Sequence, residues 1–144
     1  MTPEPVLLRR GKAFHQRVQA DWLANASGGT VRLEHPVEVR HLPAGARHFR
    51  RGRIDVFVDP SGDFVTVVEI KATAWDRIKP ANRRKLLASH RRQVMKYADT
   101  YIDRDELWVC AGVIYASPPR DLAMRSEIER YFEENALQIV WYDE

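Results

Sequence analysis

The stretch RIDVFVDPSGDFVTVVEIKAT, residues 53–73, is the part of the sequence that decides the fold. It holds two very apolar runs joined by a Pro-Ser-Gly-Asp turn, which predicts a β-hairpin with strands at 52–59 and 63–72. Three charged residues lie inside these runs: Asp55, Glu69 and Lys71. Because an unpaired ionised group away from water is costly, strands that keep such charges need something to compensate them.

Upstream of the hairpin, the sequence predicts one helix and one strand. Residues 11–25 carry apolar residues at i, i+4 and i+8, the spacing of one helix face: Phe14, Val18 and Trp22. Residues 30–42 alternate apolar and polar side chains, which is typical of a strand, and an interruption is expected at Pro36.

Downstream of the hairpin, helices and strands alternate. The pattern predicts a helix at about 81–102, a buried strand at 107–116, a helix from its N-cap Asp121 to about Asn135, and a strand at 137–142. The order α-β-β-β-α-β-α-β indicates an α/β fold, a mixed central β-sheet flanked by helices. A chain of 144 residues is long enough for one sizeable core, so residues 1–144 are expected to form a single domain.

Composition excludes several classes of protein. With 44% hydrophobic and 30% charged residues, the chain has the composition of a globular protein. The longest apolar run, 107–116, is far too short to span a membrane, and the N-terminus lacks the order of a secretory signal. Cys110 is the single cysteine and cannot form an internal disulfide. A cytoplasmic protein with no membrane contact is therefore expected.

The charges are segregated along the chain although the net charge is only +3. Arg40–Arg53 and Arg77–Lys96 contain no acidic residue, whereas Asp121–Glu144 is acidic. Two separate basic stretches predict a positive face that binds a polyanion, with nucleic acid as the expected partner. The alternative is an ordinary solvated surface.

The three charges of the hairpin suit the hydrolysis of a phosphodiester. Strand side chains repeat every two residues, so Glu69 and Lys71 point to one face, and Asp55 on the neighbouring strand can approach Glu69. Mg²⁺ or Mn²⁺ is held by one or two carboxylates, and it activates a water molecule for attack on phosphorus. A lysine beside that water can orient it or stabilise the developing charge. The plainer alternatives are an exposed Glu69–Lys71 pair and an ion pair between Asp55 and Arg53.

These residues resemble the motif of the PD-(D/E)xK nuclease superfamily, which has the restriction-endonuclease-like fold. GRID (52–55) provides the first acid, and VVEIKAT (67–73) provides acid-x-Lys at the end of an apolar strand. The resemblance extends to the branch of RecB-like exonucleases. QVMKY matches its Gln-x-x-x-Tyr motif as Gln93 and Tyr97, and GKAFH matches its Gly-x-x-x-His motif as Gly11 and His15.

The resemblance implies a role for each matched residue. Asp55 and Glu69 would be metal ligands, with His15 as a third, and Lys71 would orient or activate the attacking water. Gln93 and Tyr97 would line the active site and support the lysine. His15 could equally be an ordinary helix histidine, and Tyr97 a core aromatic.

The chain departs from the family pattern at two positions. Ile54 precedes the first acid where proline is common, and Gln19 follows His15 where a glutamate would complete the metal site. Three further acids have plainer roles. Asp59 and Asp63 are expected as turn residues, and Glu38 approaches the metals only if the sheet order allows.

The basic stretches supply the expected nucleic-acid contacts. Seven cations are expected to neutralise backbone phosphates: Arg47, Arg50, Arg51, Arg53, Arg83, Arg84 and Lys85. Trp75, just beyond the lysine strand, is expected either to stack on an unpaired base or to close the core beside the hairpin.

The sequence thus predicts a metal-dependent nuclease, a phosphodiester hydrolase that acts on DNA. The alternatives are a catalytically silent nucleic-acid-binding module of the same fold, or a nuclease toxin domain. DNA and RNA, single and double strands, end-on and internal cutting, one or two metals and the oligomeric state all stay open at this point.

Overall fold

The structure, a computed structural model, describes residues 4–25, 30–39, 50–59, 64–105 and 108–143. Its five strands are β1 (Thr30–Val39), β2 (Arg50–Asp59), β3 (Phe64–Lys71), β4 (Trp108–Tyr115) and β5 (Gln138–Trp141). The helices are α1 (Val6–Ala24), α2 (Pro80–Asp105), α3 (Leu122–Glu134) and the short 3₁₀ helix η1 (Trp75–Arg77). The expected α/β architecture and the expected order of helices and strands are confirmed.

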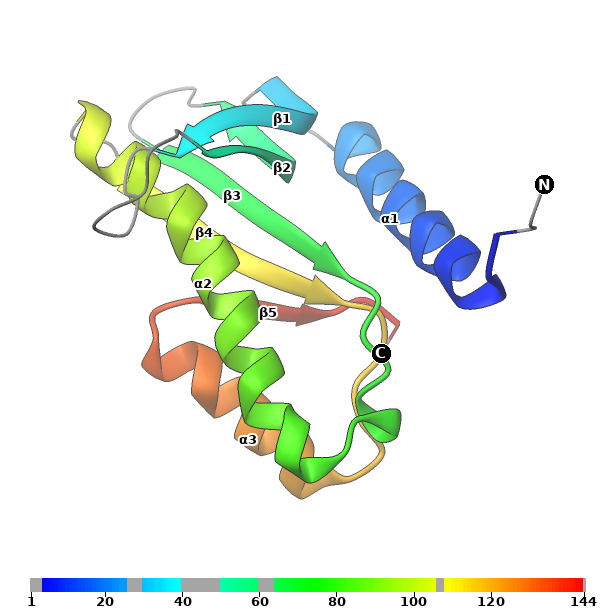
Figure 1. Ribbon diagram of the computed structural model, residues 1–144. Helices are drawn as coiled ribbons and strands as arrows, with labels where there is room; N and C mark the ends of the chain where they lie inside the picture. Colours follow the sequence, from blue (N-terminus) through cyan, green and yellow to red (C-terminus); the bar gives the residue numbers. More distant parts are fainter. Residues whose placement is uncertain (1–3, 26–29, 40–49, 60–63, 106–107, 144) are drawn as a thin grey trace.

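The strands form one mixed sheet in the order β1-β2-β3-β4-β5 (Figure 1). β2 runs antiparallel to both β1 and β3, whereas β3, β4 and β5 run parallel to one another. Helix α2 supplies the long crossover from β3 to β4, and α3 supplies the crossover from β4 to β5, as parallel neighbours require.

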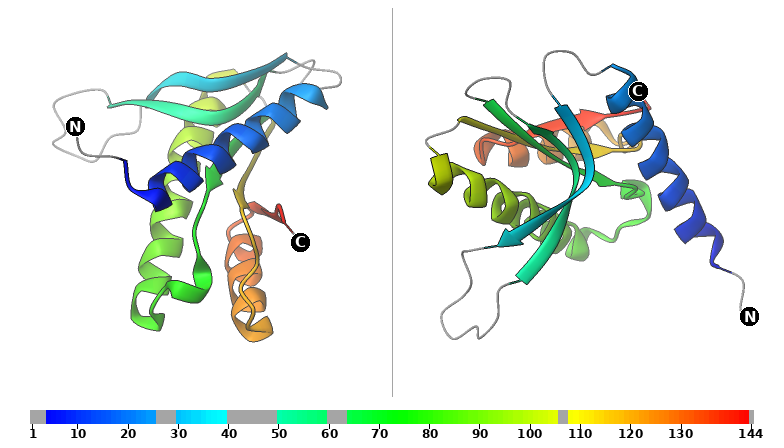
Figure 2. Two further views of the ribbon diagram at one scale, coloured as in Figure 1. Left: turned by 90° about the vertical axis from the view of Figure 1, so that its right-hand side faces the viewer. Right: turned by 90° about the horizontal axis from the view of Figure 1, so that it is seen from above.

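Helices cover both faces of the sheet (Figures 1 and 2). Val65 and Val67 of β3 pack in the cluster that also contains the buried residues of α2 and α3. Val68 and Ile70 of the same strand pack with Phe14 and Val18 of α1 in the cluster on the other face. Alternate side chains of β3 therefore contribute to the hydrophobic cores on the two faces of the sheet.

Strand β1 differs from its expected form. It continues through Pro36, which pairs with Arg53, so the expected interruption at that residue is wrong. β1 lies at the edge of the sheet, where a proline can be accommodated because one side of the strand has no partner. The irregularity falls instead at Glu34, whose φ is 50°.

The start of α3 expected from sequence is confirmed. Asp121 caps the helix, and its Oδ1 accepts hydrogen bonds from the backbone nitrogens of Ala123 (2.9 Å) and Met124 (3.4 Å). The hairpin turn at 60–63 and the residues 40–42 lie outside the described part of the chain. Within the described residues, no helix is long and apolar enough to cross a membrane.

Candidate active site

The candidate site lies where β2 and β3 separate. Their registered pairs end at Val56 with Val68, and continuing the register places Asp55 opposite Glu69. Beyond that point, Oδ2 of Asp55 accepts a hydrogen bond of 2.8 Å from the backbone nitrogen of Ile70. A carboxylate thus takes the backbone donor of β3, and the end of the ladder makes room for two acids.

Glu69 is buried beside Asp55. Its side chain is only 1% exposed, and its Oε1 lies 3.4 Å from the backbone nitrogen of Asp55. Burial and the neighbouring Asp55 raise the pKa of Glu69 to about 8. Burial also raises the pKa of Asp55, although the Ile70 N–H and His15 oppose that rise. This environment excludes the exposed surface pair as an account of Glu69.

Lys71 is held by the helix that carries Gln93 and Tyr97. The ammonium nitrogen Nζ of Lys71 donates a hydrogen bond to Oε1 of Gln93. Gln93 and Tyr97 are four residues apart on α2 and share one helix face. The structure therefore brings all three of these expected site residues together.

Tyr97 is buried behind Gln93. Burial raises the pKa of its hydroxyl, while hydrogen bonds to the Gln93 side chain and the Arg53 backbone favour the ionised form. Its ring lies on the backbone of β2 at Gly52, where an added Cβ would come within 2.6 Å of the ring edge and the hydroxyl oxygen. A glycine at that position of GRID is what lets the tyrosine reach the strand.

Helix α1 supplies His15 and Gln19 from the other side. His15 is half-buried, and its Nδ1 lies 3.9 Å from Oδ2 of Asp55. Gln19 is buried, and its Nε2 lies 3.0 Å from the backbone oxygen of Asp55 and 3.0 Å from Oε1 of Glu34. The amide of Gln19 therefore holds together β1, β2 and α1.

Glu34 is a site residue that the sequence reasoning missed. The pairs Leu33 with Val56 and His35 with Ile54 place it opposite Asp55, and its charge acts to raise the pKa of Asp55. No local signal marked it, because its position opposite Asp55 depends on the pairing of two separate strands, β1 and β2. The side chains of Glu38 and Asp59, and residue Asp63, lie outside the described part of the structure.

His90 and Tyr115 form a second missed pair, close to Lys71. Nδ1 of His90 lies 2.7 Å from the hydroxyl of Tyr115, and Tyr115 pairs in register with Lys71. Burial, and to a smaller degree Lys71, lower the pKa of His90 to about 4. The spacing of His90, Gln93 and Tyr97 along one helix face was the signal that could have found this histidine.

Two carboxylates at one buried point fit a hard divalent cation. Mg²⁺ is commonly held by one or two carboxylates, with water and substrate oxygens completing the octahedron. Asp55 and Glu69 provide such a pair, and burial raises the pKa of each carboxyl group. Among the residues that the structure describes, no group of three His, Cys, Asp or Glu side chains is arranged to hold a metal ion.

The expected nucleic-acid contacts are placed unevenly. Arg53, Arg84 and Lys85 are exposed. The side chain of Arg83 is only 16% exposed, and its Nη1 pairs with Oε2 of Glu127 at 3.0 Å. Arg47 and the side chains of Arg50 and Arg51 lie outside the described part of the chain.

Trp75 requires a correction. It is 1% exposed, and its ring packs edge-on against His90 and Tyr115. A ring enclosed in this way has no free face for an unpaired base, so stacking by Trp75 is ruled out and the alternative of a core residue holds.

Comparison with known proteins adds no family: no protein-family model matches the chain, and no curated protein sequence matches it. The class that the structure itself defines is an α/β protein with a five-stranded mixed sheet.

Proposed function

We propose that this chain is a divalent-metal-dependent nuclease with a restriction-endonuclease-like core, and that its substrate is DNA. The observation that carries the proposal is the meeting of two buried carboxylates and a lysine where β2 and β3 separate. The order of the elements is compatible with that core. The basic stretches supply charge complementary to a phosphate backbone.

Asp55 and Glu69 would hold Mg²⁺ or Mn²⁺, with His15 next to them. The bound ion would polarise the phosphate and lower the pKa of a water molecule. Glu69 has to lose its proton to act as a ligand, and a nearby cation favours that loss. The enclosing strands keep bulk water away from both carboxylates, which strengthens every charge interaction at the site.

Lys71 supplies positive charge where negative charge develops on phosphorus. The contact with Gln93 restrains its flexible side chain, so the ammonium group is already positioned before the substrate binds. Tyr97 in turn fixes Gln93 against the backbone of β2. Lys71 is thus the catalytic residue of this set, and Gln93 and Tyr97 are positioning residues.

Cleavage assays test the proposal directly. Supercoiled plasmid, linear duplex and single strands of DNA and RNA are incubated with Mg²⁺, Mn²⁺ or EDTA. Asp55→Asn, Glu69→Gln and Lys71→Ala are each expected to lower the rate by about two orders of magnitude or more. The exposed residues Glu133 and Lys12 provide the matched controls Glu133→Gln and Lys12→Ala, which are expected to keep activity.

Either of two results overturns the proposal. One is cleavage that survives in EDTA or in Lys71→Ala. The other is binding of nucleic acid with no cleavage of any substrate, which would establish the silent binding module instead.

A further inference from the structure

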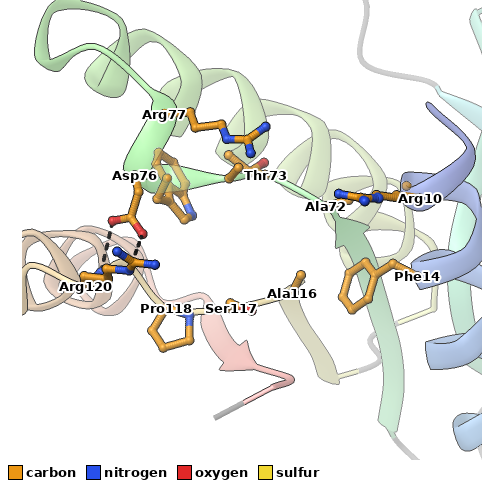
Figure 3. Close-up of a pocket in the computed structure, with 13 residues that line it drawn as sticks. Arg10, Phe14, Ala72, Thr73, Asp76, Arg77, Ala116, Ser117, Pro118 and Arg120 are labelled. Carbon is orange, nitrogen blue, oxygen red and sulfur yellow. Dashed lines mark hydrogen bonds and ion pairs between the residues drawn. The ribbon is translucent and has the colours of Figure 1, made fainter. Parts of the chain in front are cut away.

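A cavity lies one residue beyond Lys71, at the ends of the parallel strands β3 and β4 (Figure 3). Its volume is about 720 Å³, within the range of ligand-binding sites. One wall comes from α1, with Arg10 and Phe14, and the opposite wall comes from η1 and the segment after β4. Phe14 and Ala72 of the lining are the chain neighbours of His15 and Lys71.

The lining combines small residues with apolar surfaces. The small side chains of Ala72, Ala74 and Ala116 leave the space between the strand ends unfilled. Phe14 and Pro118 provide apolar surface at its rim (Figure 3). Such a lining accepts the apolar faces of a base or a sugar.

The charge of the cavity is positive. Arg10, Arg77 and Arg120 line it, and Asp76 is the single acid among the lining residues. Asp76 is already engaged, because its Oδ1 accepts from the backbone nitrogen of Arg120 at 3.0 Å and the Arg120 guanidinium lies 4.0 Å away. Arg10 and Arg77 form no ion pair with any residue that the structure describes.

The positive lining continues past Arg77. A second cavity of about 540 Å³ shares Arg77 and extends to the start of α2, where Lys79, Asn82 and Lys85 line it. No acid contributes to this second lining. Arg77, Lys79 and Lys85 thus form a row of positive charges from the first cavity to the first turns of α2.

We propose that the first cavity is a subsite for one unpaired nucleotide next to the scissile phosphate, and that the strand continues over Arg77 toward Lys85. This inference rests on the proposed nuclease function and deepens it, since it names single-stranded nucleic acid as the substrate class. A base can enter the cavity only when it is unpaired, because a duplex presents its backbone and grooves. Positive grooves with apolar surfaces for bases are how single strands are bound.

Binding measured in EDTA tests the subsite without cleavage. The probes are a fluorescein-labelled oligothymidylate and a DNA hairpin duplex of matched length, followed by fluorescence anisotropy. Arg10→Ala and Arg77→Ala are each expected to weaken single-strand binding about tenfold. Their matched controls, Arg9→Ala and Arg130→Ala, change exposed arginines outside both cavities and are expected to have little effect.

A filling variant tests the cavity apart from its charge. Ala74→Leu places bulk in the cavity and is expected to weaken single-strand binding, whereas Ala123→Leu on the exposed face of α3 is expected to leave it unchanged. Duplex binding at least as tight as single-strand binding would overturn the subsite. Equally weakened binding in the cavity variants and their controls would overturn it too. A third outcome separates the two proposals. If the cavity variants weaken single-strand binding as expected but the wild-type protein cleaves nothing with Mg²⁺, the nuclease function alone is overturned and the subsite stands.

Discussion

Glu69 carries its carboxyl group where burial and a second acid both oppose ionisation. Its pKa of about 8 stands well above the ordinary 4.5, so between these values the folded protein keeps a proton that the unfolded chain releases. The unfolded state then binds fewer protons, and the contribution of Glu69 to folding stability falls as pH rises from 4.5 to 8, by up to about 1.4 kcal/mol per pH unit. We expect Glu69→Gln to show a flatter dependence.

Urea unfolding in EDTA at pH 5 and pH 8 measures this difference. If the unfolding free energies of wild type and Glu69→Gln changed equally between pH 5 and pH 8, the raised pKa of Glu69 would be contradicted. The same measurement without EDTA tests the metal site, because a cation that binds only the folded, ionised site stabilises the folded protein by mass action. Added Mg²⁺ should stabilise the wild type more at pH 8 than at pH 5, and should leave Glu69→Gln unchanged.

Gly52 and Gly11 differ in the space available for a single added Cβ, so alanine substitutions at the two positions can be compared directly. A Cβ at Gly52 would lie 2.6 Å from Tyr97, so Gly52→Ala is expected to cost about 1–3 kcal/mol of unfolding free energy. The same substitution at Gly11 meets only Ala72 Cβ at 3.8 Å, inside a helix. Gly11→Ala should therefore stabilise the protein by about 0.5–1 kcal/mol. Thermal unfolding of both variants checks this, and equal shifts would show that Tyr97 does not pack as described.

At the scale of the elements, His90 and Tyr115 join α2 to β4 close to Lys71. The pKa of His90 is lowered to about 4 from an ordinary 6.5. Between these pH values the unfolded chain binds a proton at His90 and the folded protein does not. The contribution of His90 to folding stability therefore rises with pH across this window and declines as pH falls toward 4, by up to about 3 kcal/mol. His90→Asn should remove this dependence.

The measurement is the difference in unfolding free energy between wild type and His90→Asn, followed from about pH 4.5 to about pH 7.5, the window in which the histidine titrates. The opposite slope from Glu69 is present in both proteins and cancels in the difference. Ser89→Ala, at an exposed residue of the same helix whose side chain does not titrate, serves as the control. A difference that does not change with pH would show that His90 titrates normally.

The separation of β2 from β3 is an element-level feature with a direct chemical consequence. Where the ladder continues, backbone groups satisfy one another, and no side chain is needed. Beyond Val56 and Val68, side-chain and backbone groups pair instead: the Ile70 N–H with Asp55, and the Asp55 N–H with Glu69. The acids are thereby oriented by the strands that carry them.

For the molecule as a whole, some of the basic side chains form ion pairs with acidic residues, whereas others form none with the described residues. Arg83 pairs with Glu127 across α2 and α3, whereas Arg77 lies between the two cavities without an ion pair to any described residue. Removing one cation that binds a phosphate lowers the slope of log Kd against log salt, measured for single strands, by about 0.7. We expect that decrease from Arg77→Ala and none from Arg83→Ala. Titrations at several salt concentrations decide this, and equal slopes for both variants would refute the assignment.

Much of the fold was readable from the sequence because its signals are local. Apolar spacing marked the helices and strands, Asp121 marked the start of α3, and the two-residue period of β3 put Glu69 and Lys71 on one face. The hairpin brought Asp55 near them, since its short connection constrains the pairing. Gln93 and Tyr97 followed from one turn of helix.

What only the tertiary structure decided concerns residues that are far apart in sequence. Glu34 lies opposite Asp55 through the pairing of β1 with β2, and Trp75 is enclosed by residues from α2 and β4. Arg83 meets Glu127, and the cavity beyond Lys71 exists because three separate segments leave a gap between them. Local periodicity sets which face a side chain occupies, whereas packing between distant elements sets which other side chains it meets.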